Sequence, residues 1–204
     1  MNTATRVKTG EVRLSYCHLD EPHAFDENQK AKYSVTLIIK KDDRNTIAQI
    51  QKNYEEALQK GIEKFGQGFN RKATPLVRPE GSDKGLLVDC DKDERYAGNT
   101  DYANSYILAA KSITPPVVYD FNTKGKTPLT ADEIKNEVYS GCYGKVLFNF
   151  YPYNAGATTG IACGLDSVLK TKDGESLGGR VNAMDYFAEE FNSAADLTED
   201  DLLL

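Results

Sequence analysis

The chain has 204 residues, 40% of them hydrophobic and 27% charged, which is typical of one globular domain with a single core. It contains no run of about 18 apolar residues, which argues against a transmembrane helix. Its first residues lack the apolar stretch of a signal peptide, so we expect a cytoplasmic protein. The four cysteines form no C-x-x-C pair, which disfavours a zinc ribbon or a redox motif and predicts free, mostly buried thiols.

The formal net charge of −6 is unevenly distributed along the chain. Residues 185–204 hold seven acids and no Lys or Arg. Removing these seven from the total of 31 leaves residues 1–184 with 24 acids for 25 basic residues. The body is therefore close to neutral and has room for a local basic surface, whereas the end of the chain resembles an acidic interaction tail.

The first predicted elements are two strands and a helix. Residues 11–16 alternate Val12, Leu14 and Tyr16 with polar positions, and residues 32–40 alternate in the same way, so each predicts a strand with one wet face. From Asp42 or Asp43 to Gly66 apolar residues recur at helical spacing, which predicts an amphipathic helix of about five turns.

The rest of the chain predicts mostly strands joined by loops. Residues 66–105 are rich in Gly, Pro and charge and predict long loops around the short apolar stretch 86–88. Strands are predicted at 106–112, 116–121, 141–154 and 159–170, and a short helix at 130–139, where Thr130 and Glu133 have capping-box spacing. Several strands, two helices and one core predict a small β-barrel or α+β domain.

The strand at 141–154 has two chemically different faces. Its even positions, from Cys142 to Phe150, are small or apolar and belong in a core. Its odd positions carry Tyr143, Lys145, Tyr151 and Tyr153 on the face that an antiparallel strand usually turns to water. A surface that binds single-stranded nucleic acid needs exposed aromatic rings beside basic side chains, because bases stack on the rings and phosphates pair with Lys or Arg.

Other side chains extend this candidate nucleic-acid surface. Basic residues expected on wet strand faces are Arg13, Lys32 and Lys111. Tyr96, Tyr102 and Tyr106, which follow Arg95, could form an aromatic flap. The ordinary alternative for any one of these tyrosines is half-buried packing with a wet hydroxyl group.

The sequence also allows a second class of function, that of an enzyme. The acids at 89–94, Asp89, Asp91, Asp93 and Glu94, could hold magnesium in a nuclease or recombination enzyme, because hard cations bind carboxylate oxygens. The simpler interpretation is a solvated loop, and no catalytic pair of nucleophile and base is recognisable. A third possibility is a virion or scaffold protein whose tail mediates assembly.

Several blocks also carry a family resemblance: KYSVTLIIKKDD, YSGCYGKVLFNFYPYN, GIACGLDSVLK and DGESLGGR, in this order and before an acidic tail. In these blocks the chain resembles the single-stranded DNA-binding proteins of phages and prophages. The resemblance implies an OB-fold, here an OB-fold-like antiparallel β-barrel with two helices and long loops. It also implies sequence-tolerant binding of single-stranded DNA in phage replication or recombination, without catalysis. We expect no cofactor and no metal, and a homodimer is possible.

The expected division of the chain is a DNA-binding domain at 1–191 and a disordered acidic tail at 192–204. The tail is expected to compete with DNA for the basic surface and to dock replication or recombination proteins of the phage or host. The residues expected to make this docking contact are Glu199, Asp200, Asp201, Leu202, Leu203 and Leu204.

Overall fold

A computed structural model describes residues 6–24, 27, 29–122, 127–156 and 158–177, and the expected acidic tail lies outside them. The strands are β1 (Arg6–Lys8), β2 (Val12–His23), β3 (Lys32–Lys40), β4 (Leu87–Asp89), β5 (Ser105–Ser112), β6 (Val117–Asp120), β7 (Tyr143–Ala155) and β8 (Thr158–Lys172). The helices are α1 (Arg44–Phe65) and α2 (Ala131–Glu137), and a 3-10 turn covers Gln67–Phe69. Within the described ranges, no helix is both long and apolar enough to cross a membrane.

Five strands close into a ring in the order β7, β2, β3, β5 and β8, with β8 returning to β7. The ring confirms the predicted class, mainly β with two helices in an OB-fold-like arrangement. The β7–β8 ladder is long and antiparallel, from Tyr143 opposite Lys172 to Ala155 opposite Thr158. The junction of β5 and β8 is parallel and rests on the single pair Lys111 and Gly164. Three short strands lie outside the ring, β1 on β7, β6 on β8 and β4 on β5.

The core lies inside the ring and is formed by alternate residues of its strands. On β7, Val146, Phe148 and Phe150 are at most 2% exposed, which confirms the predicted inner face. On β2 the prediction is wrong at Tyr16, which is 50% exposed although it continues the apolar row of Val12 and Leu14. The reason is an irregularity in the β2–β3 register between Ser15 and His18, which interrupts the alternation.

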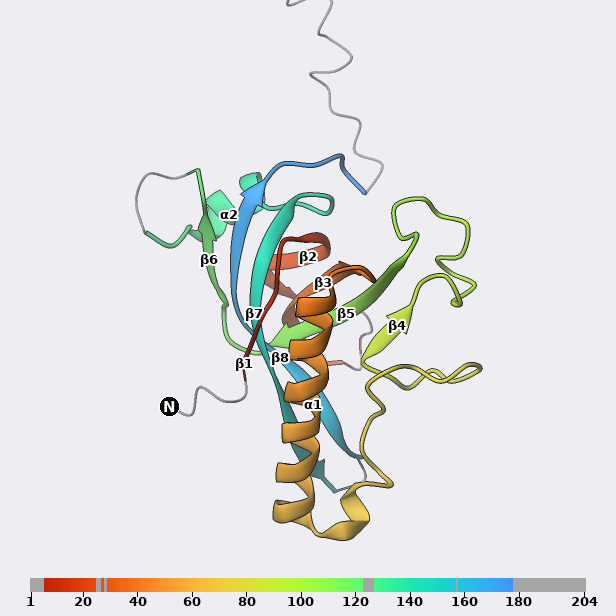
Figure 1. Cartoon of the computed structure of the whole chain (residues 1–204). Helices are drawn as coiled ribbons and strands as arrows, with labels where there is room; N and C mark the ends of the chain where they lie inside the picture. Colours follow the sequence, from red (N-terminus) through yellow and green to blue (C-terminus); the bar gives the residue numbers. More distant parts are fainter. Residues whose placement is uncertain (1–5, 25–26, 28, 123–126, 157, 178–204) are drawn as a thin grey trace, which may run out of the picture.

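Helix α1 packs lengthwise against β7 and β1 (Figure 1). Its buried residues include Ile50 and Ala57, and the ring of Tyr54 meets Phe150 edge to face at 6.2 Å between centroids. As predicted, the helix begins at an aspartate: Thr46 N donates to Asp43 Oδ1 at 3.1 Å. It ends at Gly66, whose φ of 86° suits a residue without a side chain.

Helix α2 packs against β2 at one end of the ring (Figure 1). The predicted capping box is present, because Glu133 N donates to Thr130 Oγ1 while Thr130 N donates to Glu133 Oε2 at 2.7 Å. All four cysteines are free thiols, and Cys90, Cys142 and Cys163 are buried, as the sequence predicts.

Candidate nucleic-acid interface

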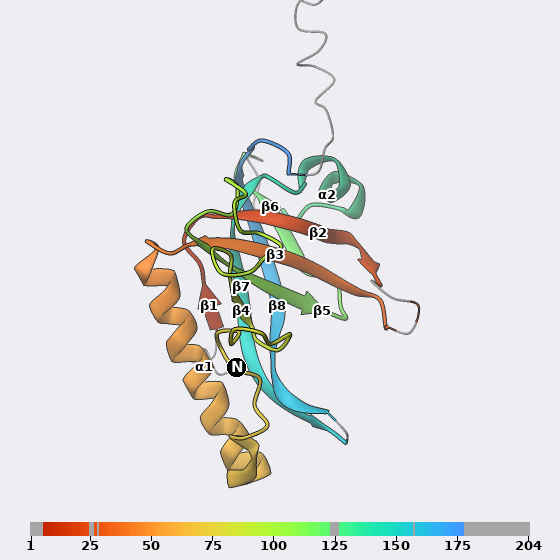
Figure 2. The ribbon, with the colours of Figure 1, turned by 90° about the vertical axis from the view of Figure 1, so that its right-hand side faces the viewer.

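The outer surface of the ring is hollowed where β3 and β5 pass between two projecting hairpins. One hairpin joins β2 to β3 and the other joins β7 to β8, and Figure 2 shows both reaching out on the same side. Two adjoining hollows lie there, which we call the lysine pocket and the tyrosine groove. They share Lys32 and Lys111.

The strand register places one outward row of side chains across this region. His18 lies opposite Ser34 on β3, and Ser34 lies opposite Lys111 on β5. Lys111 in turn lies opposite Gly164 on β8, which faces Asn149 on β7. The row therefore crosses five strands and brings together residues as far apart in sequence as 18 and 164. Apart from its ends, the row consists of small side chains and one lysine.

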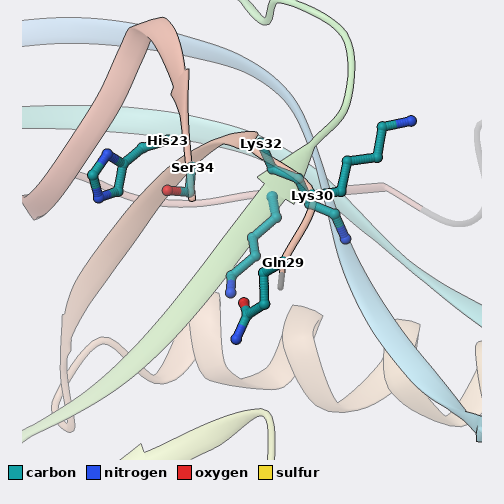
Figure 3. A pocket seen from close by; sticks show the side chains of 6 residues that line it. His23, Gln29, Lys30, Lys32 and Ser34 are labelled. Atoms are coloured by element: carbon teal, nitrogen blue, oxygen red, sulfur yellow. The ribbon is translucent and has the colours of Figure 1, made fainter. Parts of the chain in front are cut away.

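The lysine pocket is lined by His23, Gln29, Lys30, Lys32, Ser34 and Lys111, and Figure 3 shows it with the first five labelled. Desolvation lowers the pKa of Lys111, and the nearby ammonium group of Lys32 lowers it further. Two like charges at short range favour an anion between them, because the anion offsets their repulsion. A phosphate group has the charge and the size for this position.

The tyrosine groove has a volume of about 530 Å³ and carries Tyr151 and Tyr153 on its wall. On β8 the groove is lined by Ala162 and Gly164, and Gly160, two residues before Ala162, is buried beside it. A Cβ atom at Gly164 would come within 3.1 Å of Tyr151 Cε1, and one at Gly160 within 3.1 Å of the Tyr153 hydroxyl oxygen. The absence of side chains thus lets both rings lie against the sheet. Tyr151 remains 44% exposed, so a large part of it is open to a ligand.

The structure gathers a second set of predicted residues beside the groove rather than in it. Arg95 lies over the ring of Tyr96 at 5.4 Å, and Tyr96 lies 4.9 Å from Tyr102 between centroids. Tyr102 is only 8% exposed and packs on Ile38. Arg13 is close to this set, with Nη1 2.7 Å from Asp101 Oδ1. The segment 90–104 therefore covers one end of the outer sheet face as a packed layer.

Three predicted residues are placed elsewhere. Tyr106 packs against the main core, and Lys41 Nζ lies 5.1 Å from its ring centroid. Tyr143 and Lys145 occupy the predicted outer face of β7, but at the other end of the strand from Tyr151. Eight residues of extended chain separate Tyr143 from Tyr151, about 26 Å. Their part in DNA binding stays a prediction.

Three acids of segment 89–94, Asp89, Asp91 and Asp93, form ion pairs with basic side chains. Lys41 Nζ lies 2.5 Å from Asp89 Oδ1 and 2.6 Å from Asp91 Oδ2. Asp93 accepts from Arg95 through both of its oxygens, at 2.8 and 2.7 Å, and from Arg78 at 3.2 Å. Hydrogen bonds from Arg95 lower the pKa of Asp93 to about 2. In the described part of the chain, no group of three or more His, Cys, Asp or Glu side chains is placed to hold a metal ion. These ion pairs give the acids a structural role in anchoring the segment.

Several residues of the surface escape prediction from the sequence. Lys30 and Ser34 enter the lysine pocket, and Leu86 enters the groove from a loop. Gly160, Ala162 and Gly164 do leave a signal, because small residues at a spacing of two within a strand mark a face that something approaches closely.

Comparison with known proteins identifies the family of this chain. The model of the family described as the single-stranded DNA-binding protein of Enterobacter phage Enc34 matches residues 5–202. The chain belongs to the Enc34 single-stranded DNA-binding protein family. Another relative, putative protein p50 of Acyrthosiphon pisum secondary endosymbiont phage 1, is 29% identical over 199 residues, which cover 97% of this chain and 98% of the relative.

Solved structures of the Enc34 family share the fold. The single-stranded DNA-binding protein of bacteriophage Enc34 is 28% identical, with a TM-score of 0.66 and coverage of 91% of both chains. The same Enc34 protein in complex with single-stranded DNA gives a TM-score of 0.68 at 24% identity, over 86% of this chain and 91% of that one. The single-stranded DNA-binding protein gp2.5 of bacteriophage T7 shares only the fold, with a TM-score of 0.54 at 16% identity and 95% coverage of each chain.

Proposed function

We propose that this protein binds single-stranded DNA independently of sequence, without catalysis, in phage DNA replication or recombination in the host cytoplasm. The observation that carries the proposal is the junction of the two hollows, where Lys32 and Lys111 adjoin Tyr151 and Tyr153. Lysines hold phosphates, and tyrosine rings stack on bases of any identity. The family membership supports the same function.

The groove is suited to single strands rather than to duplex. Stacking on Tyr151 requires a base whose face is free, and bases in a duplex already stack on their neighbours. Hydrogen bonds that read base edges are not needed for the contact, so the binding tolerates any sequence. Each stacked base is expected to contribute about 1–3 kcal/mol.

The acidic tail has a proposed role in the same function. Seven acids without a basic residue at 185–204 would be attracted to the lysine pocket and would compete there with DNA phosphates. Once DNA displaces the tail, its last residues become available to a replication or recombination protein. A basic, apolar-lined pocket on that protein would suit Glu199, Asp200 and Asp201 followed by Leu202, Leu203 and Leu204.

Fluorescence anisotropy with labelled single-stranded DNA, duplex DNA and RNA at two salt concentrations tests the proposal. We expect tight binding of single strands and weaker binding of duplex. Equal affinity for duplex would contradict it. Incubation of the single strands with magnesium should leave them intact, whereas cleavage would favour the nuclease. Sedimentation at several protein concentrations shows whether the chain forms a homodimer.

A further inference from the structure

Tyr16 has an unusual backbone for a bulky residue. Its φ is 46°, in the left-handed region that favours glycine, and it lies where the β2–β3 register is interrupted. This conformation costs free energy and persists only where the surroundings or a function require it. Its effect is to turn an aromatic ring that would otherwise face the core out to solvent, where it is 50% exposed.

Tyr16 has aromatic and basic neighbours on segment 90–104. Ser15, next to Tyr16 in the chain, has its hydroxyl oxygen 3.5 Å from that of Tyr102, and Tyr102 lies 4.9 Å from Tyr96 between ring centroids. Burial raises the pKa of the Tyr96 hydroxyl, and the hydroxyls of Tyr16 and Tyr102 raise it further. Arg95 covers the ring of Tyr96 at 5.4 Å and is itself 58% exposed. The guanidinium group of Arg95 donates hydrogen bonds to both carboxylate oxygens of Asp93, which fix its orientation and offset its charge. Arg95 therefore presents a planar surface for stacking more than a free charge for a phosphate.

This cluster adjoins the groove across the outer face of the sheet. Ser15, the residue before Tyr16, lies opposite Thr36, which lies opposite Ala109 on β5. This row is two residues along β3 from the row of Ser34 and Lys111, a distance of about 7 Å. Ala109 itself lines the tyrosine groove. Thr36 and Ala109 are thus small side chains between the lysines and Ser15, which is 2% exposed and has the Tyr102 hydroxyl against it.

We propose that Tyr16 and the Arg95–Tyr96 pair form a second stacking site for a nucleobase, reached by a strand that continues from the tyrosine groove across Ala109 and Thr36. This inference rests on the proposed function. It adds the direction in which the DNA strand runs and the residue, Tyr16, on which its outer base stacks. Strands too short to leave the groove do not reach the second site. Longer strands gain one further stacked base.

Oligothymidylates of increasing length, bound by the wild type and by Tyr16→Gly, Tyr16→Phe and Tyr151→Ala, test the inference. For Tyr16→Gly we expect unchanged affinity for the shortest strands and a loss of about 5- to 150-fold for the longer ones. Its melting temperature should equal or exceed that of the wild type, because glycine adopts a φ of 46° without strain. Tyr16→Phe keeps the ring and should bind like the wild type at every length.

The outcomes separate this inference from the proposed function. If the wild type binds no single strand of any length, the proposed function fails. If Tyr151→Ala weakens binding but Tyr16→Gly matches the wild type at all lengths, the second site is wrong and the groove stands. A loss in Tyr16→Gly that is equal at all lengths would also overturn the second site, as would a lowered melting temperature, which would show the ring to be structural.

Discussion

Tyr151 on β7 lies against Gly164 on β8, where a Cβ atom would approach its Cε1 to 3.1 Å and the Asn149 Oδ1 to 2.7 Å. Gly164→Ala should therefore shift the tyrosine ring by a few tenths of an ångström and weaken binding of single-stranded DNA by roughly 1 kcal/mol, part of one stack. Titration of labelled oligothymidylate measures the loss. Gly68→Ala, with nothing within 4 Å of the added atom, is the matched control and should bind like the wild type.

The two faces of β7 should separate binding from stability. Tyr151→Ala or Tyr153→Ala should weaken single-strand binding by about 1–3 kcal/mol with little change in melting temperature, because these rings face the groove. Phe150→Ala, at a position 2% exposed, should lower the free energy of unfolding by about 3–5 kcal/mol by leaving a cavity. Urea unfolding and anisotropy on the same samples measure both. An unfolded Tyr151→Ala beside an intact Phe150→Ala would show the assignment of faces to be reversed.

The affinity for single-stranded DNA should fall as the salt concentration rises, because the lysine pocket binds phosphates. On single strands the slope of log K against log salt is about −0.7 for each phosphate neutralised. Lys111→Gln should make the slope shallower by about that amount. Lys52→Gln, which removes an equal charge from an exposed position of α1, is the control. Affinity that is indifferent to salt in the wild type would contradict the electrostatic contact. The variant Lys145→Gln tests whether DNA extends to the other end of β7.

The ion pairs of Asp93 should make stability depend on acid pH. The pKa of Asp93 is lowered from 3.8 to about 2, so its ionised form stabilises the folded state above pH 3.8, and this contribution is lost as the pH falls towards 2. Asp93→Asn should therefore be less stable than the wild type at pH 7, with the difference shrinking between pH 4 and pH 2. Urea unfolding across this range measures it. A difference that stays constant with pH would show that the charge of Asp93 does not stabilise the fold.

Removal of the acidic tail should tighten DNA binding. Deleting residues 193–204 takes away four of the seven acids that would compete for the lysine pocket, Asp196, Glu199, Asp200 and Asp201. The effect should be largest at low salt, where charges are least screened. Anisotropy at two salt concentrations measures it. Unchanged or weaker affinity of the deletion at low salt would rule out self-competition and leave partner docking to be tested by pulldown with the tail peptide.

Local features of the fold could be predicted from the sequence because they depend on near neighbours. The alternation on β7 and the capping residues Asp43 and Thr130 involve side chains within a few positions of one another. Tyr16 shows where this reasoning stops: a single register irregularity reverses the side of the sheet that a residue faces, and composition does not encode it.

The site was harder to predict because it depends on ring closure. Lys111 meets Gly164 only when β5 and β8 come together, and no local period connects positions 53 residues apart. The predicted face of β7 was right as a face, yet Tyr143 and Tyr151 lie at opposite ends of it. The alternation along a strand therefore predicts which side chains share a face, but not which of them line the same groove.

The pair of Lys111 and Gly164 also has a mechanical consequence. It is the one residue pair between β5 and β8 in the described part of the chain, so this junction is the shortest ladder of the ring, and the β2–β7 junction, with two pairs, is the next shortest. Lys111 belongs to one side of the β5–β8 junction, and Tyr151, carried by the hairpin of β7 with β8, belongs to the other. A DNA strand bound by both Lys111 and Tyr151 crosses this junction and links β5 to the β7–β8 hairpin. DNA bound in the groove would therefore oppose separation of β5 from β8, the junction at which a single residue pair closes the ring.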